Sequence, residues 1–454
     1  MSSLLYHRQP ALDEQWFNRL LPYIDELYIL LGIPHQQLAK LRQEFESKPF
    51  NPDLRPLLLA SKQYQQKNVE LDALLHDINT QEANQTIRQA YSLKIEELRN
   101  QNDLIVALLN KDTNAIVHLN HELYGSTDLT VFAGVCAWLR QIAGEYYDSE
   151  VRHIANAAAE VLEQVPNLNG TVHSILPDDH LFKKIRDAHF HAGGYIDQLF
   201  GTAVIPDIVT PETGDPITRR VIAAVGSQYT LQDSTDSLWG VMHNEHTVVR
   251  PANYRLQRAA FMGIISHEIG SHLLERENGI NQPLRLLSVG LDRYETSNEG
   301  RAFIREQIMY RSPYELLGEF AWEHIILLYI STSLASGAYR EPYDFMSLHK
   351  VILPVCRLLK ARHLPDNPAV AEIQARDEAW QICTRATKGT AGTGGAFSKG
   401  LVYLTGNLSA WKMAAKDPDY VFFGDVGKFD IARTDHRQFL ADFGVTPQGY
   451  QALT

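Results

Sequence analysis

Cysteine is scarce in this 454-residue chain, and the three that occur, Cys136, Cys356 and Cys383, lie far apart. They form no Cys-x-x-Cys pair, which argues against a disulfide framework and fits a reducing compartment. Long hydrophobic runs are also missing, because the longest, around residues 325–335, is too short and too rich in Ser and Thr to span a bilayer. Residues 1–10 lack the basic-then-apolar pattern of a secretory signal. We therefore expect a cytoplasmic protein without a membrane segment.

Positive charge is not in excess either. The chain has 42 Lys and Arg against 54 Asp and Glu, a formal net charge of −12. This balance argues against nucleic acid or an anionic membrane surface as the main partner. Hydrophobic residues make up 44% of the chain and charged residues 21%, which is typical of a globular protein with a sizeable core.

Apolar residues recur at helical spacing over most of the chain, beginning with a predicted helix at residues 13–31. After Pro166 a helix at 179–200 leads into short β-branched runs, which predict a small sheet. The fold class we expect is α+β and mostly helical. The predicted strands are residues 203–209, 220–225 and 247–250. The predicted regions are a helical N-terminal region, 1–84, and a larger region, 85–454, which divides into a helical part, 85–165, and a part with the sheet, 166–454.

Residues 264–272 read IISHEIGSH and place His267, Glu268 and His272 in an apolar, helix-like segment. Neutral imidazole is a good zinc ligand, and a carboxylate beside a ligand can act as a general base. These residue types indicate metal-assisted hydrolysis. The alternative is an ordinary helix whose polar histidines flank a core stripe.

The spacing His-Glu-x-x-x-His is one residue longer than the familiar His-Glu-x-x-His. Residues five apart are separated by about 140° around an ideal α-helix, too far to share a metal. A π-bulge would return both to one face, and Gly270 would tolerate the distortion. We therefore predict a locally widened helix within residues 253–277, ending at a left-handed cap formed by Asn278 and Gly279.

A catalytic zinc usually has three protein ligands, so a third is expected on a neighbouring element. Glu299 opens the next helical pattern, but residues 296–299 also read as a capping box, and both roles remain open. Asp292 and Glu295 are other candidates, whereas Glu275, one turn beyond His272, is expected to be solvated.

Other histidines and a glycine cluster have simpler explanations. The pairs His243/His246 and His189/His191 have no acid–base residue in a buried helix beside them. His324 on an apolar helix is expected to be a core histidine. Residues 389–395 are rich in glycine but lack the Gly-Lys-Ser/Thr of a phosphate-binding loop, so we interpret them as a loop that borders the site.

The chain has a series of sequence blocks in a specific order. They are HE at 267–268 with His272, ENG at 277–279, QPL at 282–284, LSVGL at 287–291 and EGRA at 299–302. Together they resemble the microtubule-associated tyrosine carboxypeptidase family, whose bacterial members are called flavohemoglobin expression-modulating QEGLA motif proteins. The resemblance extends over roughly residues 85–415.

The resemblance implies a gluzincin-like zinc metallopeptidase with one zinc per chain. His267 and His272 match the histidine ligands, Glu299 the third ligand and Glu268 the catalytic base. The chain departs from the family pattern at Asn298 and Arg301 in the QEGLA motif and at Gly400, where an acid is lost. The family's Arg-Gly-Gly region is also replaced by an altered glycine loop at residues 385–395. These departures affect the expected preference for a C-terminal tyrosine rather than the metal set.

A carboxypeptidase needs a cation near the metal to hold the terminal carboxylate of a peptide or protein substrate. Lys399 and Arg385 are the candidates, with Arg301 as a third if it faces the cleft; each is otherwise a surface charge. We expect removal of aromatic or bulky C-terminal residues. The alternatives are an endopeptidase or amidase on the same zinc site, or a non-enzymatic regulatory protein, which would have no need for Glu268.

Overall fold

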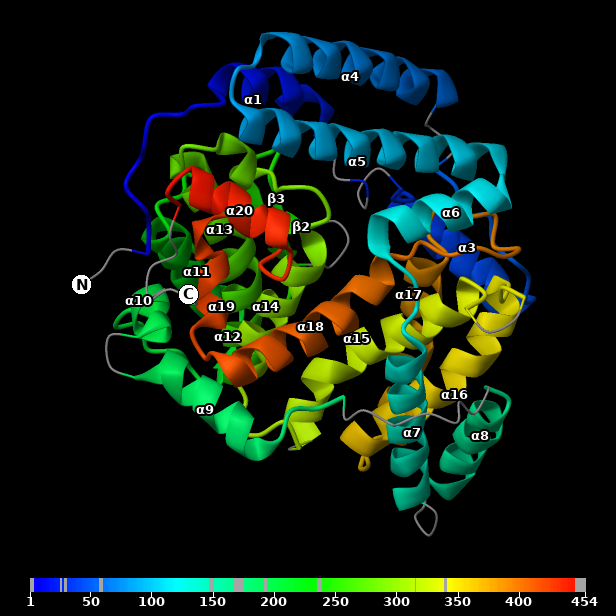
Figure 1. Ribbon diagram of the computed structural model, residues 1–454. Coiled ribbons are helices and arrows are strands. Elements are labelled where there is room, and N and C mark those ends of the chain that lie inside the picture. The colour runs from blue at the N-terminus through cyan, green and yellow to red at the C-terminus, as the bar shows by residue number, and fades with distance from the viewer. Residues whose placement is uncertain are drawn as a thin grey trace.

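The computed structural model describes residues 4–24, 27, 31–56, 60–146, 151–165, 175–191, 194–234, 239–314, 316–338 and 341–445 (Figure 1). These residues are mostly helical and contain two small sheets, which confirms the α+β class. The N-terminal helices are α1 (Glu14–Leu20), α3 (His35–Ser47), α4 (Ser61–Gln81), α5 (Gln85–Asn110), α6 (Thr113–Tyr124), α7 (Leu129–Glu145) and α8 (Arg152–Glu163). No helix among the described residues is both long and apolar enough to cross a membrane.

The rest of the chain alternates helices with short turns and strands. Its helices are α9 (Asp179–Phe190), α10 (Tyr195–Phe200), α11 (Pro211–Ala224), α12 (Arg258–His267), α13 (Leu274–Asn281), α14 (Glu295–Gln307), α15 (Leu316–Ala335), α16 (Phe345–His363), α17 (Pro368–Ala386), α18 (Lys399–Lys416), α19 (Tyr420–Phe423) and α20 (Thr434–Asp442). Its strands are β1 (Ile208–Val209), β2 (Thr230–Ser234), β3 (Gly240–Met242), β4 (Thr247–Pro251) and β5 (Leu256–Gln257). Tight helical turns are η1 (Leu21–Tyr23), η3 (Arg285–Ser288) and η4 (Gly424–Val426), and the π-helical segment is η2 (Glu268–Leu273).

The predicted helix at 13–31 is shorter than expected. Helix α1 ends at Leu20, and the chain continues as the 3-10 turn η1, which contains Pro22. Proline lacks the N–H that an α-helix would need at this position. Residues 25, 26 and 28–30 of the predicted helix lie outside the described residues.

The sheets differ from the prediction in their strands. Only the run at 247–250 forms a full strand, β4, at the centre of the order β2-β4-β3. It pairs in parallel with β2 and antiparallel with β3, neither of which was predicted. The run at 203–209 forms only the two-residue β1. The run at 220–225 is helical because Thr210 and Thr213 form a capping box and Pro211 begins α11, so the helix has started before the β-branched residues.

Helices α14 and α18 pack against each other at the centre of the molecule (Figure 1). Two glycines allow this close approach: a Cβ on Gly300 would lie 2.2 Å from the carbonyl oxygen of Gly406. The contact fixes the position of Glu299, the residue before Gly300. It also gives a physical reason for a glycine in the EGRA block.

The N-terminal segment packs on the end of α13. The backbone N–H of Tyr6 donates to Asn278 Oδ1 at 2.9 Å, and that of Gln9 donates to the Asn281 carbonyl at 2.9 Å. The predicted region boundary at 84/85 falls in the turn between α4 and α5, which lie side by side (Figure 1).

Candidate functional site

The helix that contains the His-Glu-x-x-x-His motif is widened where the spacing predicts. Residues Glu268–Leu273 form the π-helical segment η2 between α12 and α13. The carbonyl of Gly270 accepts from Tyr195 Oη at 2.8 Å and from Arg305 Nη1 at 2.7 Å. These two donors satisfy a carbonyl that the bulge displaces from the regular ladder.

The left-handed cap predicted at Asn278 and Gly279 is wrong, because both residues lie inside α13, which continues to Asn281. Gly279 instead allows α13 and η3 to approach each other closely, because a Cβ there would lie 2.5 Å from the backbone nitrogen of Ser288. The helix also begins later than predicted, at Arg258.

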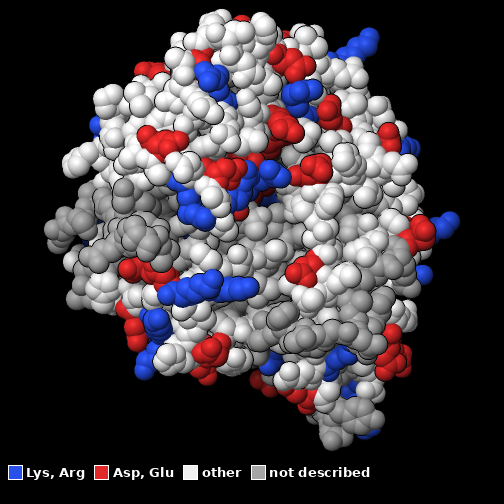
Figure 2. All heavy atoms as spheres, viewed as in Figure 1, with Lys and Arg blue, Asp and Glu red and all other residues white. Residues whose placement is uncertain are grey.

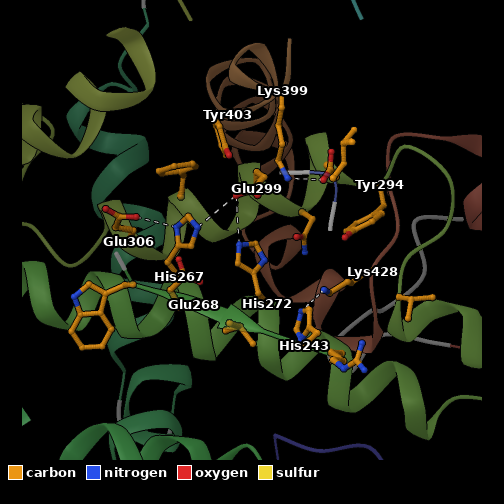
Figure 3. Close-up of a pocket in the computed structure, with 18 of the residues that line it drawn as sticks. His243, His267, Glu268, His272, Tyr294, Glu299, Glu306, Lys399, Tyr403 and Lys428 are labelled. Carbon is orange, nitrogen blue, oxygen red and sulfur yellow. Dashed lines mark hydrogen bonds and ion pairs between the residues drawn. The ribbon is translucent and has the colours of Figure 1, made fainter. Parts of the chain in front are cut away.

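The structure brings His267, His272 and Glu299 together (Figure 3). Glu299 Oε2 lies 3.6 Å from His267 Nε2 and 3.5 Å from His272 Nε2. Their ligand atoms all lie within 4.8 Å of one another, and no other trio of His, Cys, Asp or Glu in the described residues meets this condition. The side chains are 10%, 15% and 12% exposed, so they are shielded but open to the cleft.

These distances fit a zinc site better than a hydrogen-bonded cluster. Charge-assisted N–H···O bonds are about 2.7–2.9 Å long, so 3.5 and 3.6 Å are too long for them. Tetrahedral zinc with ligands at about 2.0–2.2 Å keeps ligand atoms roughly 3.4 Å apart. Two imidazoles and a carboxylate are also a set of donors that zinc accepts.

Glu306, which the sequence interpretation missed, lies behind His267. Its Oε2 is 3.0 Å from His267 Nδ1, so Nε2 is the ring atom that faces Glu299 (Figure 3). Burial by itself would lower the pKa of His267, but Glu299 and Glu306 together raise it well above its ordinary value. The seven-residue spacing of Glu299 and Glu306, which puts both on one helix face, was the available indication.

Glu299 does not occupy a capping position. Helix α14 begins at Glu295 after the N-cap Tyr294, which places Glu299 in the second turn, facing the histidines. Although burial opposes it, the interactions with His272 and His267 hold the pKa of Glu299 well below its ordinary value. The carboxylate is therefore ionised, as a metal ligand must be.

Glu268 is the first residue of η2 and lines the same cleft as the three donors. Burial raises the pKa of Glu268 above its ordinary value, against the opposing effect of His267 and His272. A carboxylate whose pKa is raised accepts a proton more readily than an ordinary one, which suits Glu268 to the role of a general base beside the three candidate ligands.

The cleft has a volume of about 660 Å³ and is lined by residues from both predicted regions, 1–84 and 85–454. Lys399 and Arg385, the predicted substrate-binding cations, are among the five Lys and Arg side chains that line it. Lys399 Nζ forms an ion pair with Glu295 at 2.7 Å, and Arg385 Nη1 donates to His324 Nε2 at 2.6 Å. His324 is thus a cleft residue rather than the core histidine that was expected. On the face shown in Figure 2, acidic and basic side chains are intermixed, without an extended patch of either sign.

Two charged residues near the motif are placed differently from the prediction. Glu275 is fully buried rather than solvated, and it pairs with the equally buried Arg301 at 3.1 Å. Asn298, a departure from the family motif, also contacts Glu275. Arg301 therefore supports the packing of α13 on α14 and does not face the cleft. Gly400 packs against Thr332, and a Cβ there would lie 2.2 Å from its hydroxyl oxygen.

The remaining candidates divide between the cleft and the core. His243 lines the cleft beside β3, where Lys428 Nζ lies 2.9 Å from its Nε2. Burial, with Lys428, holds the pKa of His243 well below its ordinary value. His189 is buried and stacks on Phe422. The glycine-rich loop does not line the cleft: Gly392 packs against Pro52, and its left-handed φ of +71° explains the glycine.

The fold and site together define a mostly helical α+β protein in which two histidines of a widened helix meet a glutamate of the neighbouring helix α14. Residues 218–319, which include all four motif residues, match the family model described as microtubule-associated tyrosine carboxypeptidase. The chain is 24% identical over 180 residues to microtubule-associated tyrosine carboxypeptidase 1 of Homo sapiens, a match that covers 38% of this chain and 32% of that protein. The Mus musculus protein of the same name is 26% identical over 152 residues, covering 32% of this chain and 26% of that protein.

These matches confirm the family resemblance that the motifs predict. The matched part of the chain spans about a third or less of the length of these relatives. No solved structure matches the chain.

Proposed function

We propose that this chain is a zinc-dependent metallopeptidase that acts as a carboxypeptidase, removing one aromatic or bulky residue from the C-terminus of a peptide or protein. The observation that supports it most is the arrangement of His267, His272 and Glu299 at ligand separations, with Glu268 between the two histidines in sequence. One zinc per chain would be held by these three side chains.

When bound, zinc would supply a Lewis acid for the scissile carbonyl and lower the pKa of water in the site. Glu268 takes the proton from the attacking water and delivers it to the leaving amine. Glu306 Oε2 lies 3.0 Å from His267 Nδ1, and this contact favours a ring whose Nε2 is the atom left to bind a metal. Phe303, whose ring centroid lies 4.7 Å from that of His267, excludes water from one side of the histidine.

Attack at the C-terminus is supported by the printed name of the relatives and by the cations of the cleft. A terminal carboxylate held by a cation fixes the scissile bond one residue from the end. Tyr294, Phe303 and Tyr403 line the cleft and provide apolar faces for a bulky side chain.

The test is a matched pair of peptides that differ only in a free or amidated C-terminus, incubated with zinc-loaded protein and read by mass spectrometry. We expect loss of one residue from the free acid, and cleavage of the amide about 10- to 100-fold more slowly, because a charge-assisted contact is lost. Equal cleavage of both, or internal cuts, would identify an endopeptidase. Absence of cleavage with one equivalent of zinc bound would favour the regulatory alternative.

A further inference from the structure

Five Lys and Arg side chains line the cleft, and the two that the sequence predicts to bind substrate, Lys399 and Arg385, have partners that differ in charge. Lys399 Nζ lies 2.7 Å from the Glu295 carboxylate, which neutralises much of its charge. Arg385 instead donates one N–H to His324 Nε2 at 2.6 Å and another to the Tyr403 hydroxyl at 3.4 Å. Both of these acceptors, an imidazole nitrogen and a phenol oxygen, are uncharged groups.

His324 holds Arg385 from a separate helix. Arg385 is on α17, Tyr403 on α18 and His324 on α15, so three helices meet at the guanidinium. Burial, together with the nearby positive charges of Arg385 and Lys360, lowers the pKa of His324 to about 3. The ring is therefore neutral, with its proton on Nδ1 and its Nε2 lone pair directed at the arginine.

Arg385 is also the last of a row of contacting side chains that begins at the candidate ligand His267. The ring of Phe303 is 4.7 Å from that of His267 and 5.9 Å from that of Tyr403, and Arg385 Cζ lies 5.6 Å from the Tyr403 centroid. A planar guanidinium can hold a carboxylate through two parallel hydrogen bonds. An aromatic side chain attached to that carboxylate would lie against the two rings.

We propose that His324 is a positioning residue that orients Arg385, and that Arg385, rather than Lys399, holds the terminal carboxylate of the substrate. This inference rests on the proposed carboxypeptidase function. A neutral imidazole suits the role because it fixes the guanidinium without cancelling the charge that the substrate needs. A glutamate in its place would compete with the substrate.

The experiment compares His324→Leu and His324→Gln with the wild type on the matched free-acid and amide peptides. For His324→Leu we expect KM for the free acid to rise about 10- to 100-fold with kcat little changed, and the amide to be unaffected. Glutamine retains a hydrogen-bond acceptor, so His324→Gln should recover most of the loss. His349→Leu is the control, since His349 packs on Phe45 outside the cleft.

A fall in kcat on both peptides alike, or unchanged KM in both variants, would overturn the proposal. Thermal unfolding of each variant identifies a folding defect. If His324→Leu has such a defect, the kinetics of His324→Gln alone test the proposal. If the wild type cleaves neither peptide, calorimetric binding to zinc-loaded protein separates the two hypotheses. Tighter binding of the free acid that His324→Leu abolishes supports the positioning role even then, whereas equal binding of acid and amide overturns it.

Discussion

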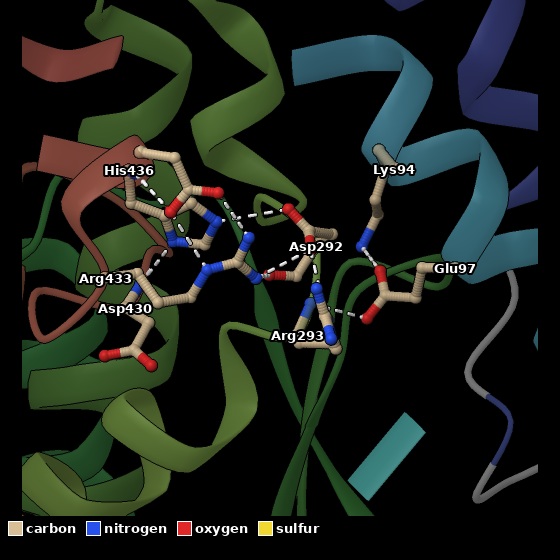
Figure 4. Close-up of polar contacts among 8 residues, drawn as sticks. Lys94, Glu97, Asp292, Arg293, Asp430, Arg433 and His436 are labelled. Atoms are coloured by element: carbon tan, nitrogen blue, oxygen red, sulfur yellow. Dashed lines mark hydrogen bonds and ion pairs between the residues drawn. The ribbon is translucent and has the colours of Figure 1, made fainter. Parts of the chain in front are cut away.

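Among the described residues, two of the buried clusters that bring histidine and carboxylate together differ in how the carboxylate is satisfied. In one, Glu299 faces two imidazole nitrogens at 3.5 and 3.6 Å. In the other, Asp292 accepts from His436 Nε2 at 3.2 Å and from Arg433 Nη1 at 2.6 Å (Figure 4). In the second cluster, Arg433 supplies a positive charge and Asp292 accepts hydrogen bonds of ordinary length. In the first cluster, the oxygen and nitrogen atoms are separated by distances that suit ligands of a shared metal ion.

The Asp292 cluster connects distant parts of the chain just before α14. Arg433 and His436 come from the C-terminal part of the chain, and the neighbouring Arg293 donates its backbone N–H to Glu97 Oε1 of α5 at 2.8 Å (Figure 4). Arg293 has a φ of +51°, a left-handed conformation that is uncommon outside glycine. These contacts give the cluster a structural role, so the two clusters should respond differently to substitution.

The largest expected effect concerns Glu268. Glu268→Gln should retain zinc and stability but lose about 10²- to 10⁴-fold in turnover, because the base is removed and the ligands remain. Glu277→Gln, a substitution at a half-buried carboxylate outside the cleft on α13, is the control. Steady-state rates and zinc content are measured together, and full activity of Glu268→Gln would exclude it as the base.

Substituting the carboxylate of each cluster should separate binding from stability. Glu299→Gln should lose its zinc during dialysis that leaves about one equivalent in the wild type, since a catalytic site needs three ligands. Asp292→Asn should keep zinc but lose about 2–3 kcal/mol of unfolding free energy, because Arg433 and His436 lose a charged partner. Elemental analysis and urea unfolding test this pair, and equal zinc in both variants would contradict the ligand assignment.

The sequence predicted the motif better than its surroundings. The π-bulge followed from the spacing of His267 and His272, because helix geometry depends on local residue count. Glu306 and His324 were missed because their roles depend on how α14, α15 and α17 pack, which local patterns do not encode. Glu275 was predicted to be solvated because its buried partner Arg301 is 26 residues away.

The close packing at the bulge gives a further prediction. A Cβ on Gly270 would lie 1.9 Å from Tyr195 Oη, so Gly270→Ala should cost about 1–3 kcal/mol and weaken zinc binding. Adding Tyr195→Phe removes the clashing oxygen and should recover part of the loss, a non-additive result. Gly144→Ala is the matched control, since nothing lies within 4 Å of a Cβ there. Additive losses in the double variant would show that the clash is not the cause.

The smallest expected effect is a difference between the two clusters in how their contribution to the free energy of unfolding depends on pH. In the metal-free protein the raised pKa of His267 means that its contribution to stability is complete below about pH 6.5 and is lost as pH rises toward the higher folded pKa. Burial by itself would raise the pKa of Asp292, but hydrogen bonds from His436 and Arg433 lower it well below its ordinary value. Its contribution is therefore present above about pH 3.9 and is lost only as pH falls.

Urea unfolding of chelated and zinc-loaded protein between pH 6 and 9 tests the difference. The chelated protein should lose up to about 1.4 kcal/mol per pH unit relative to the zinc-loaded form, because zinc keeps His267 neutral throughout. Asp292→Asn should leave this pH-dependent gap unchanged, whereas His267→Asn should remove it. Parallel stability curves for the chelated and zinc-loaded wild type would mean that His267 does not exchange a proton for the metal.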